Sequence, residues 1–257
     1  MKHLWILFLI LVFACTEKAS EEQKERPSPV EHVIVIGVDG MSPDGILNAP
    51  TPFLDLLMEE GAYTFSARAV LPTSSSSNWA TMVTGVGPEQ HGITSNGWER
   101  DEYILPPIIE GEEGIFPTVF SHIKNAKPDA YLIALYHWSG FGRLIEESVI
   151  DDSRHVDGEV ETMIETVRAF ESQKPTFTFI HLDHVDHAGH VHGHGSELYY
   201  ESITLADSLI GEIVGAASVY GLLDNGIVII SSDHGGIGYG HGGETLEEIE
   251  IPFIIYG

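Results

Sequence analysis

The chain is poor in cysteine and in basic residues. Its 257 residues contain one cysteine, Cys15, and 12 lysines and arginines against 39 aspartates and glutamates, for a formal net charge of −27. With one cysteine the chain forms no internal disulfide, and beyond Cys15 it has no thiolate for a metal. A chain this acidic repels the phosphate backbones of nucleic acids. Nucleic-acid binding by a basic patch is therefore excluded. An anionic small-molecule substrate would need a local reversal of this field, which bound divalent cations would provide.

The N-terminus lacks an apolar run long enough to cross a bilayer. Residues Leu4–Ala14 are apolar but fall short of the about 20 residues that a membrane-spanning helix needs. A basic start precedes this run and a small residue ends it, so residues 1–14 are predicted to be a secretory signal peptide. The segment LVFAC at residues 11–15 resembles the bacterial lipoprotein box, which implies that Cys15 becomes a lipidated N-terminus. A signal peptide cut elsewhere and an uncleaved anchor are the alternatives.

The next segment has the composition of a linker. Residues 16–31 are charged, contain proline and have almost no large apolar side chains, as is typical of a flexible tether. We therefore expect a lipidated N-terminus and tether at residues 15–31 and a single domain at residues 32–257. These features predict an exported bacterial lipoprotein, periplasmic or at the cell surface, anchored to the membrane through Cys15 only. The chain stops at Gly257, at the end of a predicted strand, which leaves open whether the domain is complete.

Apolar runs alternate with helical patterns throughout the domain. Runs rich in valine and isoleucine suit strands that are buried on both faces of a parallel sheet. The predicted strands are Val33–Val38, Tyr131–Tyr136, Thr176–His181, Gly226–Ile230 and Ile251–Tyr256, and the predicted helices are Thr51–Glu60, Asn78–Thr84, Thr118–Lys124, Glu159–Ser172 and Glu197–Tyr220. This alternation predicts an α/β fold with a doubly wound, mostly parallel sheet and helices on both faces.

Aspartate and histidine follow three of these predicted strands. Asp39 follows the first strand. Asp183, Asp186 and His190 follow the third, and Asp233 and His234 follow the fourth. The carboxyl ends of parallel strands form one edge of a sheet, and ligands bind in the crevice outside it. These distant segments are therefore expected to converge, and their oxygen and nitrogen atoms suit zinc or a similar ion.

Each group has a simpler explanation when it is taken alone. Asp39 could shape a turn or cap a helix, and the six histidines between residues 181 and 194 could form a solvated, metal-sequestering tract without catalysis. We favour Asp186 and His190 as ligands, because a segment that leaves a strand and turns can bring both to one ion. We expect four other histidines to lie at the rim of the site or to contact substrate: His184, His187, His192 and His194.

A serine-rich stretch supplies a candidate nucleophile. The segment LPTSSSSNWATMVTG, residues 71–85, places four consecutive serines before or at the start of the predicted helix Asn78–Thr84. A helix N-terminus offers free N–H groups and a positive dipole, which suit a phosphoryl oxygen. A metal ion can activate a serine in such a place. The alternative is a flexible serine run that caps the helix.

Together these residues resemble the alkaline phosphatase superfamily, and specifically its type I phosphodiesterase/nucleotide pyrophosphatase branch. The resemblance covers nearly all of the chain from His32 to Gly257. Its motifs are VIVIGVDG, LPTSSSSNWATMVTGVGPEQHGITSNGW, the D-x-x-G-H of Asp186 to His190, SSDHGG and GHGGE. The resemblance implies an alkaline phosphatase-like catalytic domain at residues 32–257.

The resemblance also implies catalytic residues. The branch has a Pro-Thr-x-(Thr/Ser)-x-Pro-Asn pattern that falls on residues 72–78, which puts Ser75 at the position of the nucleophile. Ser77 replaces the usual proline, so Ser74 and Ser76 remain open alternatives. Asn96 matches the asparagine whose amide holds a non-bridging phosphoryl oxygen.

Two divalent metal ions are implied as cofactors, with Zn²⁺ as the expected metal. One ion would be bound by Asp39, Ser75, Asp233 and His234, and the other by Asp186, His190 and a later histidine. Many phosphodiesterases of the branch place that last ligand farther downstream than this chain extends. His241, within GHGGE, is similar to a histidine of the related GPI ethanolamine-phosphate transferases and is assigned to this role.

The implied function is hydrolysis of phosphate esters, as a phosphodiesterase or a phosphatase, through metal-bound Ser75 and a phosphoseryl intermediate. The expected partner is a small-molecule phosphate ester, and the oligomeric state stays undefined. A sulfatase of the same superfamily is one alternative, although it would carry Cys/Ser-x-Pro-x-Arg at the nucleophile. A non-catalytic zinc-binding surface lipoprotein is another. Also open are the choice between monoesters and diesters and the placement of four aromatic residues at the site or in the core: Trp79, Trp98, Trp138 and Phe141.

Overall fold

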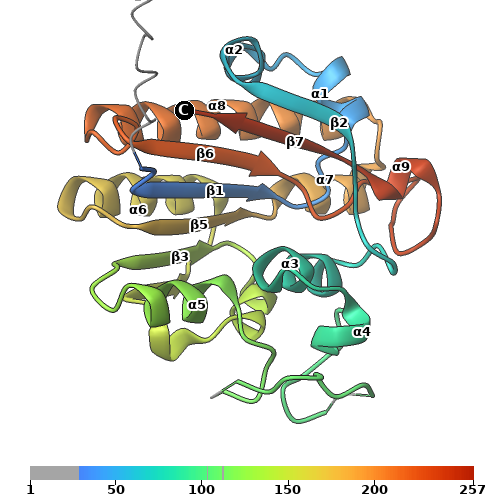
Figure 1. The fold of residues 1–257 in the computed structure, drawn as a ribbon. Coiled ribbons are helices and arrows are strands. Elements are labelled where there is room, and N and C mark those ends of the chain that lie inside the picture. Colours follow the sequence, from blue (N-terminus) through green and yellow to red (C-terminus); the bar gives the residue numbers. More distant parts are fainter. Residues whose placement is uncertain (1–28, 103, 112) are drawn as a thin grey trace, which may run out of the picture.

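A seven-stranded sheet in the order β2-β7-β6-β1-β5-β3-β4 runs through the computed structural model, which describes residues 29–102, 104–111 and 113–257 (Figure 1). The strands are β1 (His32–Val38), β2 (Ala62–Arg68), β3 (Leu132–Tyr136), β4 (Asp152–His155), β5 (Phe177–Leu182), β6 (Gly226–Ser231) and β7 (Glu250–Tyr256). Strands β6, β1, β5, β3 and β4 are parallel neighbours, and β7 is antiparallel to both β2 and β6. The predicted mostly parallel α/β sheet is confirmed.

Helices cover both faces of this sheet (Figure 1). Ile34, Ile36 and Val38 of β1 pack into a core with side chains of α2, α6 and α8, whereas Val35 packs on the other face with α3 and α5. The helices are α1 (Pro43–Asn48), α2 (Pro52–Glu60), α3 (Ser75–Thr84), α4 (Pro88–His91), α5 (Val119–Ala126), α6 (Glu159–Ser172), α7 (His184–His192), α8 (Glu197–Val219) and α9 (Leu246–Ile249), with 3₁₀ turns η1 (Ser139–Leu144) and η2 (Glu147–Val149). The predicted signal peptide, Cys15 and all but the last residues of the tether lie outside the described residues.

Helix α8 is long and apolar enough to cross a membrane, judged by length and composition alone. It packs against α2, α6 and α7, and its Ile203, Ile210 and Ile213 side chains are fully buried in the core. We therefore interpret α8 as a core helix of the α/β domain.

The structure contains every predicted strand and helix, with modest shifts at the ends. The largest shift is in α3, which begins at Ser75 rather than at Asn78. Strands β2 and β4 were not predicted, because both are edge strands whose largely exposed or polar residues form no continuous apolar run. Helix α7 was not predicted either; it follows β5 directly and places Asp186 and His190 one helical turn apart.

The last residue of α4, His91, is a buried histidine whose titration should affect stability. Its Nδ1 accepts a hydrogen bond from the Ile93 N–H at 3.0 Å, and its Nε2 lies 3.0 Å from Thr81 Oγ1. Burial lowers the pKa of His91 from 6.5 to about 4. Below pH 6.5 the unfolded chain therefore takes up a proton that the folded chain refuses, so stability falls as the pH drops toward 4.

We expect His91→Asn, in metal-free protein, to reduce by about 1 kcal/mol the stability lost between pH 7.5 and pH 5.5. Urea unfolding at the two pH values measures this loss. The matched control is His122→Asn, which changes an exposed histidine and should leave the loss as in the wild type. An unchanged loss in His91→Asn would mean that His91 does not resist protonation in the fold.

Candidate active site

The three central strands β6, β1 and β5 deliver the predicted ligands to one edge of the sheet. Asp39 follows β1, Asp186 lies on α7 directly after β5, and Asp233 follows β6. All three carboxylates are buried, with 1%, 8% and 1% of the residue exposed, respectively. Gly40 makes this approach possible: it has a φ of 68°, and a Cβ there would lie 2.9 Å from the Asp186 Cα atom.

One group of ligands surrounds His234. Its Nε2 atom lies 3.3 Å from Asp39 Oδ1, 3.2 Å from Asp233 Oδ2 and 3.2 Å from Ser75 Oγ. Asp39, Asp233 and His234 are close enough together to hold one metal ion. The structure therefore brings together the four residues predicted for one ion.

A second group surrounds Asp186. His190 Nε2 lies 3.2 Å from Asp186 Oδ2, and His241 Nε2 lies 3.8 Å from Asp186 Oδ1. His241 comes from the segment between β6 and α9, and its ring stacks on that of His234 with a centroid distance of 3.7 Å. The two groups are therefore neighbours. Asp186, His190 and His241 are also close enough together to hold one metal ion.

The segment that carries His241 is bonded to the turn before the serine run. The Thr73 hydroxyl accepts a hydrogen bond from Gly242 N–H at 2.9 Å and donates one to the Gly243 carbonyl at 2.9 Å. The Thr73 carbonyl oxygen also lies 2.7 Å from His241 Nδ1. The second group and the candidate nucleophile are thus held by one set of contacts.

The three histidines of the two ligand groups have the same kind of orientation. Each places Nδ1 against a backbone carbonyl oxygen: His234 on Gly235 at 2.7 Å, His190 on Tyr239 at 2.9 Å and His241 on Thr73 at 2.7 Å. A carbonyl only accepts, so each Nδ1 carries the hydrogen and each Nε2 presents a lone pair to the carboxylates. Metal-binding histidines are fixed by this kind of contact.

The carboxylates also have free acceptor atoms. Asp39 Oδ1, Asp186 Oδ1 and Asp233 Oδ2 are buried and have no hydrogen-bond partner among the described residues. Burial, together with neighbouring Asp233, raises the pKa of Asp39 well above its usual value, and burial with neighbouring Asp186 does the same to the pKa of Asp233. Burial also raises the pKa of Asp186 to about 6. Unshared lone pairs and crowded negative charge are what divalent cations bind, so the residues fit the predicted metals.

Ser75 is the first residue of α3. Its hydroxyl contacts His234, and Asn96 Nδ2 lies 3.4 Å from the same oxygen. The hydroxyl of Ser74 is bonded to that of Ser77, and the Ser76 hydroxyl is buried without a partner in the described part of the chain. Among the three serines that the sequence left open, Ser75 alone has its hydroxyl bonded to the residues of the metal group.

Asn96 has its amide orientation fixed by α3. The Ser76 N–H donates to Asn96 Oδ1 at 2.8 Å, which leaves the Nδ2 group on the side of Ser75. A cavity of about 530 Å³ opens beside Asn96 and is also lined by Glu99, Trp138, Ser139, Gly140 and Arg143. Asn96 therefore stands between the Ser75 hydroxyl and a space that can receive part of a substrate.

Two arginines join the walls of this cavity. Arg143 donates to the carbonyl oxygens of Asn96 at 3.1 Å and Trp98 at 2.7 Å. In return, Arg100 donates to the carbonyls of Gly142 at 3.2 Å and Ile145 at 2.6 Å. The loop of Asn96 and the turn η1 are therefore fixed to each other.

The four aromatic residues separate into two roles. Trp79, Trp98 and Phe141 are buried in the core on the α3 side of the sheet. Trp138 is partly exposed and lines the cavity next to Asn96, with the Arg143 guanidinium carbon 5.9 Å from its ring centroid. Only Trp138 among them is placed to contact a substrate in this cavity.

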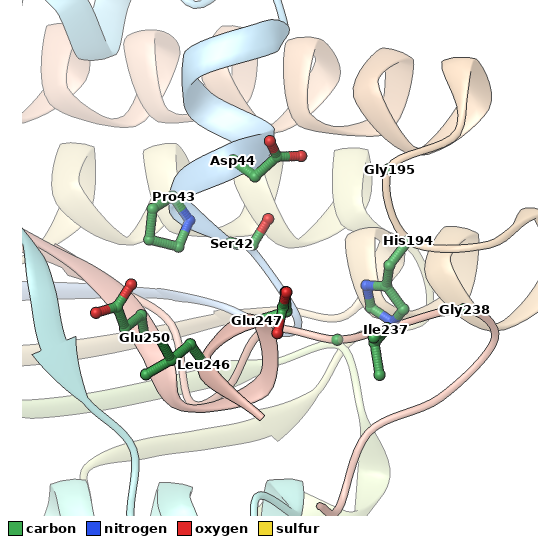
Figure 2. A pocket seen from close by; sticks show the side chains of 11 residues that line it. Ser42, Pro43, Asp44, His194, Gly195, Ile237, Gly238, Leu246, Glu247 and Glu250 are labelled. Atoms are coloured by element: carbon green, nitrogen blue, oxygen red, sulfur yellow. The ribbon is translucent and has the colours of Figure 1, made fainter. Parts of the chain in front are cut away.

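Figure 2 shows a different hollow, of about 410 Å³, between the start of α1 and residues 236–238. His194 stands on its wall, and the carboxylates of Asp44, Glu247 and Glu250 line it, but none of its lining residues is lysine or arginine. An anionic phosphoryl group would be repelled there. The cavity beside Asn96, by contrast, has Arg143 among its lining residues.

The fold is the alkaline phosphatase-like fold that the sequence predicts. The chain belongs to the type I phosphodiesterase / nucleotide pyrophosphatase family, whose sequence model matches residues 33–107 and 115–245. The fold is similar to that of murine ectonucleotide pyrophosphatase/phosphodiesterase 5 in an inactive form with AMP, with a TM-score of 0.66 and 22% identity over 80% of this chain and 57% of that one. It is also similar to a 2-O GAG sulfatase, with a TM-score of 0.69 and 14% identity over 89% of this chain and 64% of that one.

The relatives with similar sequences are much longer than this chain. Mouse ectonucleotide pyrophosphatase/phosphodiesterase family member 1 is 25% identical over 193 residues, which cover 72% of this chain and 21% of that protein. Bovine bis(5'-adenosyl)-triphosphatase ENPP4 is 26% identical over 243 residues, 89% of this chain and 52% of that protein. The chain therefore spans between a fifth and about half of these two relatives.

Proposed function

We propose that this chain is a metal-dependent hydrolase of phosphate diesters, with zinc as the expected metal. The observation that carries the proposal is the arrangement around Ser75. Three histidines present Nε2 lone pairs, and three buried carboxylates present oxygens without donors, next to one serine hydroxyl. A zinc-storing surface protein would need no serine hydroxyl and no positioned amide beside its ligands.

Two ions would be held by the residues predicted from the sequence. Asp39, Asp233, His234 and Ser75 would hold one, and Asp186, His190 and His241 the other. Such ions, when bound, lower the pKa of the serine hydroxyl and offset negative charge on the phosphoryl group and the leaving oxygen.

The remaining chemistry belongs to Ser75, Asn96 and water. Ser75 Oγ, having lost its proton, forms a bond to phosphorus while the bond from phosphorus to one ester oxygen breaks, and that alcohol leaves with a proton. The Asn96 amide, held by Ser76 N–H, donates to a non-bridging phosphoryl oxygen. Water then cleaves the phosphoseryl ester, which returns the Ser75 hydroxyl and releases the product.

The charge near the cavity favours diesters over monoesters. A monoester carries a second negative charge, which needs a free cation nearby. Arg143 is the cation that lines the cavity, and its guanidinium is bonded to the Glu99 carboxylate at 2.5 Å as well as to backbone carbonyls. A diester carries a single negative charge, and its second alcohol can occupy the space beside Trp138.

Nucleotide esters are the first substrates to test. The murine structural neighbour was solved with AMP, and the bovine relative is named for a dinucleoside triphosphate. Export of this chain through residues 1–14 and anchoring through Cys15 remain part of the proposal, as does its bacterial periplasmic or surface location.

A panel of esters tests the proposal. We expect kcat/KM for bis(p-nitrophenyl) phosphate and for the p-nitrophenyl ester of thymidine 5'-monophosphate to exceed that for p-nitrophenyl phosphate by at least about tenfold. A chelator should abolish this activity and zinc should restore it. Faster cleavage of the monoester would contradict the diester preference, and turnover of p-nitrophenyl sulfate alone would identify a sulfatase. Stoichiometric zinc without turnover of any ester would favour the non-catalytic lipoprotein.

A further inference from the structure

The two carboxylate oxygens of Asp39 have different surroundings. Oδ2 lies 3.0 Å from the indole nitrogen of Trp79 and 3.2 Å from Nε2 of His181. Oδ1 has no hydrogen-bond partner in the described chain and lies on the side of His234. One oxygen is thus occupied by two side chains, and the other is free for a ligand.

Trp79 has no freedom to leave this contact. Its side chain is fully buried on α3, and its ring lies over Gly37 of β1, where a Cβ would approach within 2.5 Å of the indole. The rings of Phe179 and Phe141 pack edge-on against it, with centroid distances of 5.9 and 6.2 Å. An indole nitrogen only donates, so the Trp79 N–H is directed at Asp39 Oδ2.

His181 approaches the same oxygen from the neighbouring strand. It pairs with Gly37 in the β1–β5 register, is fully buried, and has its ring centroid 5.0 Å from that of Trp79. As a metal ligand Asp39 is ionised and can only accept, so in that state the hydrogen of this contact belongs to His181 Nε2. The sequence places His181 at the end of a predicted buried strand, and an imidazole in that apolar run is the signal that marks it.

We propose that Trp79 and His181 are positioning residues that hold Asp39 Oδ2 by two donors and so direct Oδ1 to the metal group of Asp233 and His234. The two donors come from different elements, α3 and β5, and meet at a carboxylate that follows β1. They fix the rotation of the Asp39 side chain before any ion binds. Asp39 then loses little freedom on binding, which increases its affinity for the ion.

Substitution of His181 gives the sharpest test. The inference rests on the proposed metal function, but the test measures metal affinity rather than activity. His181→Phe keeps an aromatic ring but removes the donor, and His181→Gln keeps an N–H near the position of Nε2. We expect His181→Phe to weaken the ion at Asp39 by about 10- to 100-fold, and the other ion by much less. His181→Gln should restore most of this affinity. Titration of metal-free protein with Zn²⁺ or Co²⁺ against a competing chelator measures both sites.

Variants of tryptophan test the same inference independently and include a matched control. Trp79→Phe should weaken the same ion as His181→Phe. Trp98→Phe is the control, because Trp98 is also buried in that core but its indole nitrogen has no hydrogen-bond partner among the described residues. It should leave both metal affinities as in the wild type. Circular dichroism and thermal unfolding confirm that each variant is folded.

Other outcomes overturn the inference. Asp39, His181 and Asp183 also lie close enough to hold an ion, so His181 would be a ligand if wild-type protein bound three ions and both His181→Phe and His181→Gln lost one. Unchanged affinities in His181→Phe would exclude the positioning role. Wild-type protein that binds two ions without hydrolysing any ester contradicts only the proposed function, because the positioning of Asp39 is read from the affinities themselves.

Discussion

Replacing Ser75 with alanine is expected to reduce diester hydrolysis by at least about 10⁴-fold, since the chain loses the oxygen that bonds to phosphorus. Two zinc ions per chain should still bind, because the ligand groups keep the carboxylates and imidazoles of Asp39, Asp186, Asp233 and the three histidines. Kinetics with bis(p-nitrophenyl) phosphate and metal analysis of the same preparation measure both quantities. The combination of lost turnover and retained metal separates a nucleophile from a residue that merely supports the fold.

The adjacent serines are natural controls for this experiment. Ser74→Ala removes a hydroxyl that is bonded to Ser77, and Ser76→Ala removes a buried hydroxyl without a partner in the described chain. Both should retain turnover within about tenfold, since neither hydroxyl contacts His234. Activity that survives in Ser75→Ala and disappears in one of the neighbours would move the nucleophile to that neighbour.

We expect Asp233→Asn to be more stable than the wild type without metal and less stable than the wild type with zinc bound. Burial and the neighbouring Asp186 raise the pKa of Asp233 well above that of an unfolded chain. An acid with a raised folded pKa stabilises the fold at low pH, and this contribution is lost as pH rises through the folded pKa. At pH 8 an asparagine therefore avoids a destabilising buried charge, and its oxygen can still accept from the Gly40 N–H.

Thermal unfolding at pH 8 shows this reversal directly. Without metal, Asp233→Asn should unfold at a higher temperature than wild type, by about 2 to 4 °C for each 1 kcal/mol gained. With zinc at about 1,000 times its Kd, wild type should gain about 4 kcal/mol, or roughly 8 to 16 °C, and the variant much less. The exposed Asp129→Asn serves as control and should follow wild type in both states. A variant that is less stable than wild type without metal would disprove the buried repulsion.

Much of this architecture follows from patterns that are visible in the sequence. The continuous apolar run of β1 and its following aspartate predict a buried parallel strand that ends at a ligand edge, and the structure has both. The same reasoning places Asp233 and His234 after β6, beside β1. Strand ends can be predicted in this way because burial on two faces leaves a strong compositional signal.

Other parts of the site leave no such signal. Helix α7 contains four histidines, an aspartate and a glycine, none of which favours a helix, and tertiary packing of Val185 and Ala188 overrides that preference. The contacts of Trp79 and His181 with Asp39 depend on three elements far apart in the chain. A pattern along one strand or helix does not encode such contacts, because they arise only when the sheet is assembled.

The bonds that Thr73 makes to the segment of His241 have a consequence for metal uptake. We expect that segment and the turn before Ser75 to become ordered together, because one hydrogen bond that Thr73 donates and two that it accepts connect them. The chain entropy that is lost when the first ion arrives does not have to be lost again for the second. Zinc loading should accordingly be cooperative, with few molecules holding a single ion at intermediate concentrations.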